Sequence, residues 1–139
     1  MLSGRRTITV QWGDCDPAGI VYFPRYFEWF DASTAALFES AGLPKHTMIA
    51  RFAIVGIPLV DARCRFIKPS TFGDRVEIAS KIASWGRASF EVEHTLLRGS
   101  DVAVEGYEKR VWVERAPDGA LRSRPLPAEV LALFSGGAV

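Results

Sequence analysis

The stretch that decides the fold is Gly13–Pro24, whose sequence reads GDCDPAGIVYFP. Pro17 fixes its own φ and Gly19 permits a positive φ, so the two residues predict a tight, defined bend. Pro24 suits the first position of a helix, where its missing N–H removes no hydrogen bond. We predict a helix from that proline to about residue 41, closed by Gly42, because apolar side chains recur along it at helical spacing: Tyr26, Phe27, Phe30, Leu37, Phe38 and Ala41.

The start of this helix carries no capping side chain. Ser, Thr, Asp or Asn would be preferred there, but the sequence has Tyr22 and Phe23. We therefore expect the amides of Phe23, Arg25 and Tyr26 to be unpaired and to point outward at the positive end of the helix. Such a terminus can stabilise negative charge that develops on a carbonyl oxygen. Together with the carboxylate of Asp16 a few residues upstream, it indicates acyl chemistry.

The polar side chains of the stretch have different expected roles. An aspartate in a turn often accepts a hydrogen bond from its own backbone, and this is one interpretation of Asp16. The other is catalysis, in which the carboxylate either attacks a carbonyl carbon or acts as a general base on water. Asp14 is interpreted as structural. Cys15 is not expected to be a nucleophile, because no histidine stands in its sequence context to activate it.

Length and composition narrow the class of protein. The 139 residues are predicted to form one domain, 1–139, with 48% hydrophobic and 24% charged residues. Seventeen basic and sixteen acidic residues give a net charge of +1, which argues against a nucleic-acid partner and against an anionic membrane surface. With no signal pattern and no apolar run that could span a bilayer, we expect a soluble, cytoplasmic protein. Cys15 and Cys64 are then expected to be free thiols.

The rest of the chain predicts strands joined by short turns. Alternating patterns predict strands at residues 5–12, 58–67, 76–82, 90–96 and 102–114. Trp85–Arg87 is expected to connect a hairpin, and turns are expected at Gly99–Asp101 and Pro117–Gly119. Residues 45–53 are either irregular or a short helix, and residues 128–134 form a short terminal helix. One early helix followed by hairpin strands predicts an α+β fold with an antiparallel sheet against the helix.

Two of these strands are expected to contribute side chains to the core. The strand at 58–67 has an apolar side formed by Val60, Ala62, Cys64 and Phe66. In the strand at 90–96, His94 shares a face with Phe90, Val92 and Leu96, so we expect a satisfied histidine of the core or of a subunit interface. The other histidine is His46. Neither has neighbours at metal-ligand spacing, and we predict no metal site.

Three stretches of the chain resemble the hydroxybenzoyl-CoA thioesterase family of hot-dog-fold proteins. They are Gly13–Pro24 with the helix through Asp31, Ile54–Pro58 (IVGIP), and Phe66–Asp74 (FIKPSTFGD). The similarity extends from about residue 7 to residue 112. It implies a hot-dog fold, in which an antiparallel β-sheet wraps around one long α-helix, and it implies hydrolysis of an acyl-CoA thioester.

The resemblance also implies roles for individual residues. Asp16 matches the catalytic carboxylate, and Phe23 supplies the backbone N–H that polarises the thioester carbonyl. The residues that we predict to contact the substrate are Gly19, Tyr22, Tyr26, Asp31, Ile57, Lys68 and Arg87. Tyr22 and Tyr26 either wall the acyl pocket or pack the core. Asp31 either lies near the hydroxyl of the substrate's ring or is an exposed helix aspartate.

Two positions depart from the family's pattern. Ile57 is apolar at the variable position of the IVGIP segment, which favours a less polar acyl end than hydroxybenzoyl. The family has a basic cluster after the tryptophan matched by Trp85, and here only Arg87 remains of it. We therefore expect the phosphates of CoA to be held elsewhere as well, by Lys68 or by arginines of a neighbouring subunit.

The sequence thus predicts an acyl-CoA thioesterase that converts an aromatic (benzoyl- or hydroxybenzoyl-like) or short-to-medium acyl-CoA to the free acid and CoA. No cofactor is expected, because CoA is part of the substrate. Family members form dimers with active sites at the subunit interface and commonly pair into tetramers, so a homo-oligomer, a dimer of dimers, is expected. Two alternatives stay open. One is a non-catalytic acyl-CoA-binding protein of the same fold, and the other is a hydratase or dehydratase, which would ordinarily need a histidine at the helix.

Overall fold

The computed structural model describes residues 1–136. Its strands are β1 (Ser3–Thr9), β2 (Leu59–Phe66), β3 (Arg75–Trp85), β4 (Ser89–Arg98), β5 (Asp101–Val111), β6 (Val113–Arg115) and β7 (Leu121–Ser123). Its helices are α1 (Pro24–Ser40), α2 (Lys45–Phe52) and α3 (Ala128–Phe134), with a 3₁₀ turn, η1 (Trp12–Asp14), ahead of α1. These elements confirm the predicted α+β class. No helix within residues 1–136 is long and apolar enough to cross a membrane.

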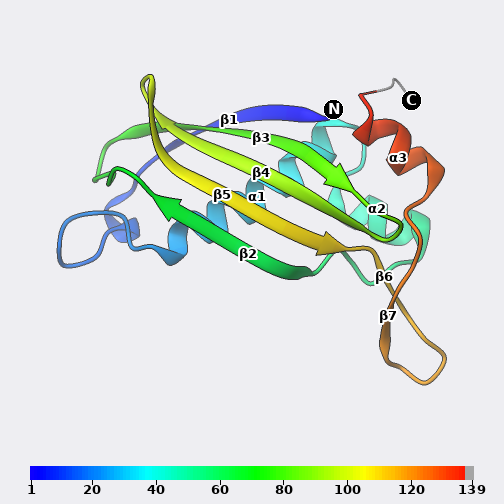
Figure 1. Cartoon of the computed structure of the whole chain (residues 1–139). Coiled ribbons are helices and arrows are strands. Elements are labelled where there is room, and N and C mark those ends of the chain that lie inside the picture. Colours follow the sequence, from blue (N-terminus) through cyan, green and yellow to red (C-terminus); the bar gives the residue numbers. More distant parts are fainter. Residues whose placement is uncertain (137–139) are drawn as a thin grey trace.

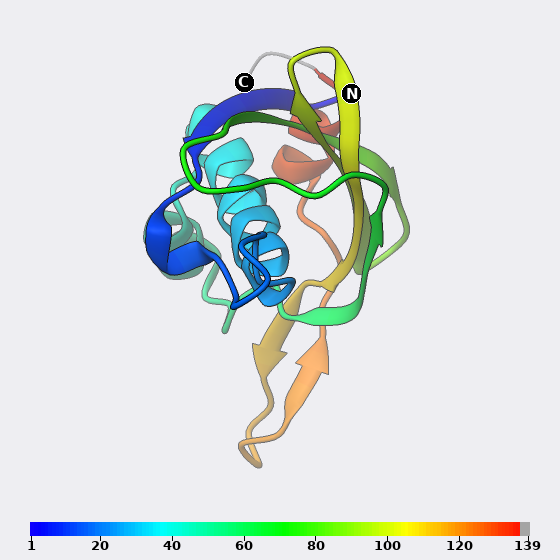
Figure 2. The ribbon, with the colours of Figure 1, turned by 90° about the vertical axis from the view of Figure 1, so that its left-hand side faces the viewer.

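Five strands form one antiparallel sheet in the order β1-β3-β4-β5-β2. The sheet curves around α1, which lies against its inner face (Figure 1). Strands β6 and β7 pair only with each other and form a hairpin that extends away from the helix and the sheet (Figure 2). The sheet therefore has two edges, β1 and β2, and the second of these lies beside the start of α1.

The helix approaches the sheet most closely where Phe30 meets Gly106 of β5. A Cβ added to Gly106 would lie 2.5 Å from Cε2 of the Phe30 ring, so only glycine leaves room for the ring. The same ring stacks on His94 of β4, with centroids 4.8 Å apart and an angle of 6° between the planes. Both Phe30 and His94 are buried. This contact fixes α1 on the sheet midway along the helix.

The boundaries of the predicted elements are largely confirmed. Helix α1 ends at Ser40, and Gly42 follows with a φ of 87°, while the Leu43 N–H donates to the Phe38 carbonyl. Of the two alternatives for residues 45–53, the helix is found, at residues 45–52, and α3 has the predicted bounds. The hairpin connection at Trp85–Arg87 and the turns at Gly99–Asp101 and Pro117–Gly119 are found where expected.

Three strand predictions are wrong in extent. The strand predicted at 76–82 ends three residues too early, since β3 continues to Trp85. The first strand ends at Thr9 and not at residue 12, because the Asp14 side chain accepts the Gln11 N–H and folds the chain into η1. The strand predicted at 102–114 stops at Val111, because the Trp112 N–H donates to the Ala88 carbonyl and the chain turns into the separate β6–β7 hairpin.

The apolar side predicted for residues 58–67 is only partly covered. Strand β2 pairs with β5 on one side and is an edge of the sheet. Val60 is 58% exposed and Phe66 is 53% exposed, whereas Cys64 packs against the core beneath α1. Periodicity identified the apolar face correctly, but it does not show that a strand lies at an edge.

Candidate functional site

The Gly13–Pro24 stretch folds into the tight bend that its proline and glycine predict. The Asp16 N–H donates to the Ile20 carbonyl and the Gly19 N–H donates to the Asp16 carbonyl, with Gly19 at a φ of 81°. The Ala18 N–H donates to Oδ1 of Asp16 at 2.8 Å. The carboxylate is therefore held by its own turn through one oxygen. No hydrogen bond to its other oxygen, Oδ2, is found within residues 1–136.

Asp14 serves the local fold. Its Oδ2 accepts the Gln11 N–H at 2.8 Å, and its Oδ1 lies 3.5 Å from Nε of Arg25 in α1. Its backbone carbonyl accepts the Tyr22 N–H. These contacts join the turn to the first residues of the helix, so the two neighbouring carboxylates have different surroundings, as their sequence context suggested.

The start of α1 differs from the prediction at two of three amides. The Arg25 N–H donates to the Tyr22 carbonyl, and the Tyr26 N–H donates to the Phe23 carbonyl, so neither amide is free. Phe23 itself takes a helical conformation, and the first turn closes with short-range bonds for that reason. In the part of the chain that the structure describes, the Phe23 N–H has no acceptor. One unpaired donor thus stands at the positive end of a 17-residue helix.

A surface hollow of about 350 Å³ brings several predicted residues together. Asp16, Phe23, Tyr26 and Lys68 all line it, with apolar walls from Ile20, Val21, Phe66, Ile67 and Pro69. The Tyr26 ring is buried and lies 5.7 Å from the Phe66 ring. Burial raises the pKa of Tyr26, so this phenol is neutral at ordinary pH. The hollow therefore combines a carboxylate, a helix terminus and apolar walls.

The other predicted contact residues lie outside this hollow. Tyr22 is 51% exposed and its ring stacks edge-on against Phe23. Gly19 is exposed in the turn, and Arg87 is exposed in the β3–β4 connection.

Lys68, which lines the hollow, has a charged partner. Its Nζ lies 3.1 Å from Asp101, so the charge of Lys68 is paired at the rim of the hollow.

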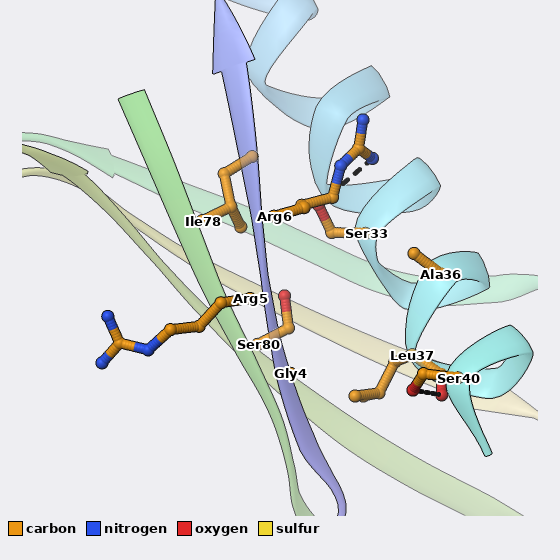
Figure 3. A pocket seen from close by; sticks show the side chains of 9 residues that line it. All are labelled: Gly4, Arg5, Arg6, Ser33, Ala36, Leu37, Ser40, Ile78 and Ser80. Carbon is orange, nitrogen blue, oxygen red and sulfur yellow. Dashed lines mark hydrogen bonds between the residues drawn. The ribbon is translucent and has the colours of Figure 1, made fainter. Parts of the chain in front are cut away.

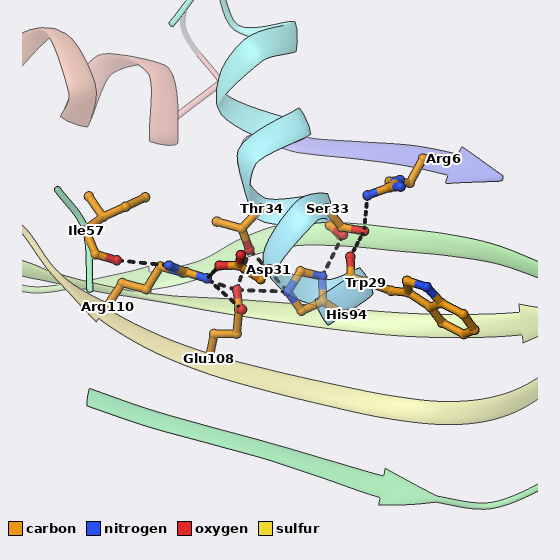
Figure 4. Close-up of polar contacts among 10 residues, drawn as sticks. Arg6, Trp29, Asp31, Ser33, Thr34, Ile57, His94, Glu108 and Arg110 are labelled. Carbon is orange, nitrogen blue, oxygen red and sulfur yellow. Dashed lines mark hydrogen bonds and ion pairs between the residues drawn. The ribbon is translucent and has the colours of Figure 1, made fainter. Parts of the chain in front are cut away.

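Asp31 and Ile57 lie in a second cluster, farther along α1. Arg110 of β5 connects them: its Nη2 donates to Asp31 Oδ1 at 2.6 Å, and its Nη1 donates to the Ile57 carbonyl at 2.9 Å (Figure 4). The Asp31 side chain is half exposed, and the Arg110 side chain is only 4% exposed. Asp31 is therefore an anchored carboxylate at the surface and not a freely rotating helix aspartate.

The anchor continues into a buried polar network. Arg110 Nη2 also donates to Glu108 Oε2 at 2.9 Å, and Glu108 Oε1 lies 3.1 Å from His94 Nε2 (Figure 4). Thr34 of α1 donates to the same carboxylate, and His94 Nδ1 lies 2.7 Å from the Ser80 hydroxyl. Burial raises the pKa of Glu108, but hydrogen bonds from His94, Arg110 and Thr34 and the charge of Arg110 outweigh it and leave the pKa below its usual value.

Sequence reasoning did not identify Glu108 and Arg110. Both face α1 together with Val104 and Gly106, and both are 3% exposed. His94 is confirmed as a satisfied core histidine. Burial raises the pKa of the Cys64 thiol to about 12, and both cysteines are free. No group of three or more possible metal ligands is found in residues 1–136.

A separate crevice of about 50 Å³ lies between β1 and α1 (Figure 3). Small and hydroxyl-bearing residues line much of it, among them Gly4, Ser33, Ala36, Ser40 and Ser80. The Ser33 hydroxyl donates to the Trp29 carbonyl within the helix. The crevice contains no carboxylate, and it is distinct from the hollow at Asp16.

A model of the thioesterase-like superfamily matches residues 10–134 of this chain. The chain belongs to that superfamily. The 4-hydroxybenzoyl-CoA thioesterase of Pseudomonas sp. strain CBS-3 is 37% identical over 140 residues, which cover 94% of this thioesterase and 99% of the relative. A 1,4-dihydroxy-2-naphthoyl-CoA hydrolase of Synechococcus elongatus is 32% identical over 63% of this chain and 64% of its own length.

Solved structures agree with the sequence comparison. The structure of the Pseudomonas 4-hydroxybenzoyl-CoA thioesterase superposes with a TM-score of 0.88 at 30% identity, covering 96% of this thioesterase and 99% of that chain. A gentisyl-coenzyme A thioesterase superposes with a TM-score of 0.81 at 32% identity, covering 95% and 99%. The hot-dog fold and the membership of a thioester-hydrolysing family are thereby confirmed. This protein is a thioesterase.

Proposed function

We propose that this thioesterase hydrolyses an acyl-CoA whose acyl group is aromatic or of short to medium length, with Asp16 as its catalytic carboxylate. The observation that carries the proposal is that Asp16 and the start of α1 at Phe23 line one hollow. A thioester carbonyl in that hollow can accept the Phe23 N–H while the carboxylate acts on its carbon. The helix terminus then stabilises the oxyanion as the carbonyl is attacked.

The turn geometry leaves one carboxylate oxygen available for this chemistry. Oδ1 of Asp16 is held by the Ala18 N–H, which leaves Oδ2 for the reaction. As a nucleophile, Oδ2 bonds to the carbonyl carbon, the C–S bond breaks, CoA leaves as the thiolate, and water then hydrolyses the mixed anhydride. As a general base, Oδ2 takes a proton from the water that attacks, and that proton passes to the leaving sulfur. Both routes consume one water and release the acid and CoA.

The relatives support an aryl-CoA substrate. A structure of a 4-hydroxybenzoyl-CoA thioesterase variant with an aspartate-to-asparagine substitution contains 4-hydroxybenzoyl-CoA, and that chain superposes with a TM-score of 0.89 at 29% identity. The gentisyl- and dihydroxynaphthoyl-CoA enzymes are likewise named for hydroxylated aryl acyl groups. For this chain we propose that Tyr26 walls the acyl pocket. The exposed Arg87 provides positive charge for the CoA phosphates, and Lys68 can do so by exchanging its exposed ion pair with Asp101 for a phosphate.

The proposal includes assembly through β2. This edge strand has an unpaired side and exposes Leu59, Val60 and Phe66, and a second copy can cover both features. If two β2 strands pair antiparallel about a two-fold axis, the Leu59 end of one copy meets the Phe66 end of the other. Phe66 lines the Asp16 hollow, and Leu59 is paired with Arg110, which holds Asp31. Each site then combines Asp16 of one copy with Asp31 and Ile57 of the other.

A thiol-release assay tests the proposed function. The assay compares benzoyl-, hydroxybenzoyl-, phenylacetyl- and straight-chain acyl-CoAs with the wild type, Asp16→Asn and a matched control, Asp14→Asn. We expect wild-type turnover of at least one substrate and a loss of at least about a hundredfold in kcat for Asp16→Asn. Asp14→Asn removes a neighbouring charge but leaves Asp16 in place, so it should lose much less.

Two results would contradict the proposal. If Asp16→Asn keeps wild-type turnover, Asp16 is not the catalytic carboxylate. If the wild type binds these CoA thioesters at equilibrium and releases no thiol, the chain is a binding protein for them and not an enzyme that acts on them.

A further inference from the structure

We infer that Arg110 is a positioning residue that fixes the orientation of the Asp31 carboxylate and thereby sets which acyl groups the thioesterase prefers. The inference rests on the proposed function, because it takes Asp31 to face the acyl end of the substrate. Arg110 is buried beneath Asp31 and cannot touch the substrate itself. It acts through the two groups that it holds, Asp31 and the Ile57 carbonyl.

The geometry around Arg110 requires a guanidinium. Its N–H groups reach acceptors on three different segments: Asp31 on α1, the Ile57 carbonyl in the segment before β2, and Glu108 on its own strand. A planar guanidinium can donate in several fixed directions at once, whereas a lysine ammonium is a compact charge on a flexible stem. Arg110 therefore ties the helix, the loop and the sheet together at one point.

The consequence for Asp31 is a fixed direction of hydrogen bonding. Oδ1 is occupied by Arg110 at 2.6 Å, and no hydrogen bond to Oδ2 is found in residues 1–136. Because half of the side chain is exposed, Oδ2 is the atom that a ligand can reach. The seam between Asp31, Ile57 and Arg110 encloses only about 10 Å³, so an acyl group meets Asp31 from outside and does not enter the seam. The carboxylate thus presents one acceptor to the substrate.

An anchored acceptor discriminates between acyl groups that carry a donor and those that do not. A ring hydroxyl donates to Oδ2, while an unsubstituted ring leaves the desolvated carboxylate without a partner. A ring methoxy group places a second acceptor against the carboxylate. Substrate preference then depends on which atom of residue 31 faces outward. Because Arg110 can only donate hydrogen bonds, it binds an oxygen of residue 31 and leaves the other terminal atom facing the substrate.

The test uses Asp31→Asn and Arg110→Lys with benzoyl-, 4-hydroxybenzoyl- and 4-methoxybenzoyl-CoA, measuring kcat/KM for each pair. In Asp31→Asn, Arg110 should bind the amide oxygen and turn the NH₂ group toward the substrate. The ratio of hydroxybenzoyl to methoxybenzoyl turnover should then fall at least tenfold from the wild-type value. An amide that is free to rotate would instead offer its oxygen to the hydroxyl and keep the wild-type ratio, and that result would overturn the inference.

Arg110→Lys supplies the second measurement. It should reduce the hydroxybenzoyl-to-benzoyl ratio at least fivefold. In a protein that already carries Asp31→Ala, it should have no further effect on that ratio. Equal losses for all three substrates would show a merely structural role and overturn the inference. Asp31→Asn changes only a half-exposed side chain, so the first measurement stands even if Arg110→Lys does not fold. If turnover depends on Asp16 but the ratios are unchanged in the variants, the inference alone is refuted. A wild type that hydrolyses straight-chain acyl-CoAs but none of these three substrates also refutes the inference alone. A wild type that hydrolyses no acyl-CoA of the whole panel refutes both the inference and the proposed function.

Discussion

The contact between α1 and the sheet makes a quantitative prediction for Gly106→Ala. The added Cβ would lie 2.5, 2.6 and 3.1 Å from three atoms of the Phe30 ring. The ring has little freedom to retreat, because it is 2% exposed and stacks on His94. Overpacking of this kind costs about 1–3 kcal/mol, and replacing glycine by alanine regains about 0.4–1 kcal/mol by restricting the unfolded chain.

We therefore expect Gly106→Ala to lower the free energy of unfolding by about 1–2 kcal/mol, which corresponds to roughly 4–8 °C in Tm. Urea unfolding measured at a fixed protein concentration checks this value, since the proposed assembly would make stability depend on concentration. Gly4→Ala is a matched control in β1, because its Cβ would meet only the tip of Leu37, at 3.3 Å. That variant should lose no more than about 0.5 kcal/mol, because the contact is looser and the gain from restricting the unfolded chain applies to it as well.

A double mutant tests whether the Phe30 ring causes the loss of stability in Gly106→Ala. Adding Phe30→Leu to Gly106→Ala removes the ring that the new methyl group meets, so the two changes together should cost less than their sum by at least about 0.5 kcal/mol. Strict additivity, or a Gly106→Ala protein as stable as the wild type, would refute the argument that Phe30 cannot move.

Two further predictions concern the buried carboxylate and the edge strand. Glu108→Gln should cost about 3–5 kcal/mol at pH 7, because it removes the charge that pairs with buried Arg110. The pKa of Glu108 is lowered on folding, so its contribution is present above its ordinary value of 4.5 and is lost as pH falls through the lower folded pKa. Urea unfolding from pH 7 to pH 3 should therefore show the wild type losing its advantage over Glu108→Gln below about pH 4.5, and a constant difference would contradict this reasoning. Val60→Lys on β2 should shift sedimentation toward the monomer and reduce turnover, while Thr7→Lys on β1 should do neither; an unchanged assembly in Val60→Lys would argue against pairing through β2.

The sequence carries strong local signals for the helix and for the turn before it. Pro24 and Gly42 mark the start and the end of α1, and the spacing of its apolar residues specifies the buried face. The bend at Pro17 and Gly19 follows in the same way from backbone preferences. These features depend on neighbouring residues alone, and for that reason they can be predicted without knowledge of the tertiary structure.

The buried network could not be predicted in this way. Alternation along β5 separates Glu108 and Arg110 from Glu105 and Lys109, but both faces of that strand then carry charges. Which face turns inward is decided by α1, whose Phe30 needs the space at Gly106. His94 on an otherwise apolar face was the one available signal, because a buried imidazole needs polar partners on neighbouring strands.

The network also explains why the helix and the acyl end of the proposed site are linked. Burying Glu108 and Arg110 carries a desolvation cost that apolar side chains of similar volume would avoid. The network connects the helix to the sheet at two points. Glu108 contacts both Thr34 of α1 and His94 of β4, and Arg110 donates to Asp31 of α1. Of these groups, Asp31 is the one that is half exposed. In the proposed site, a change within the network therefore reaches the substrate through the orientation of that single carboxylate.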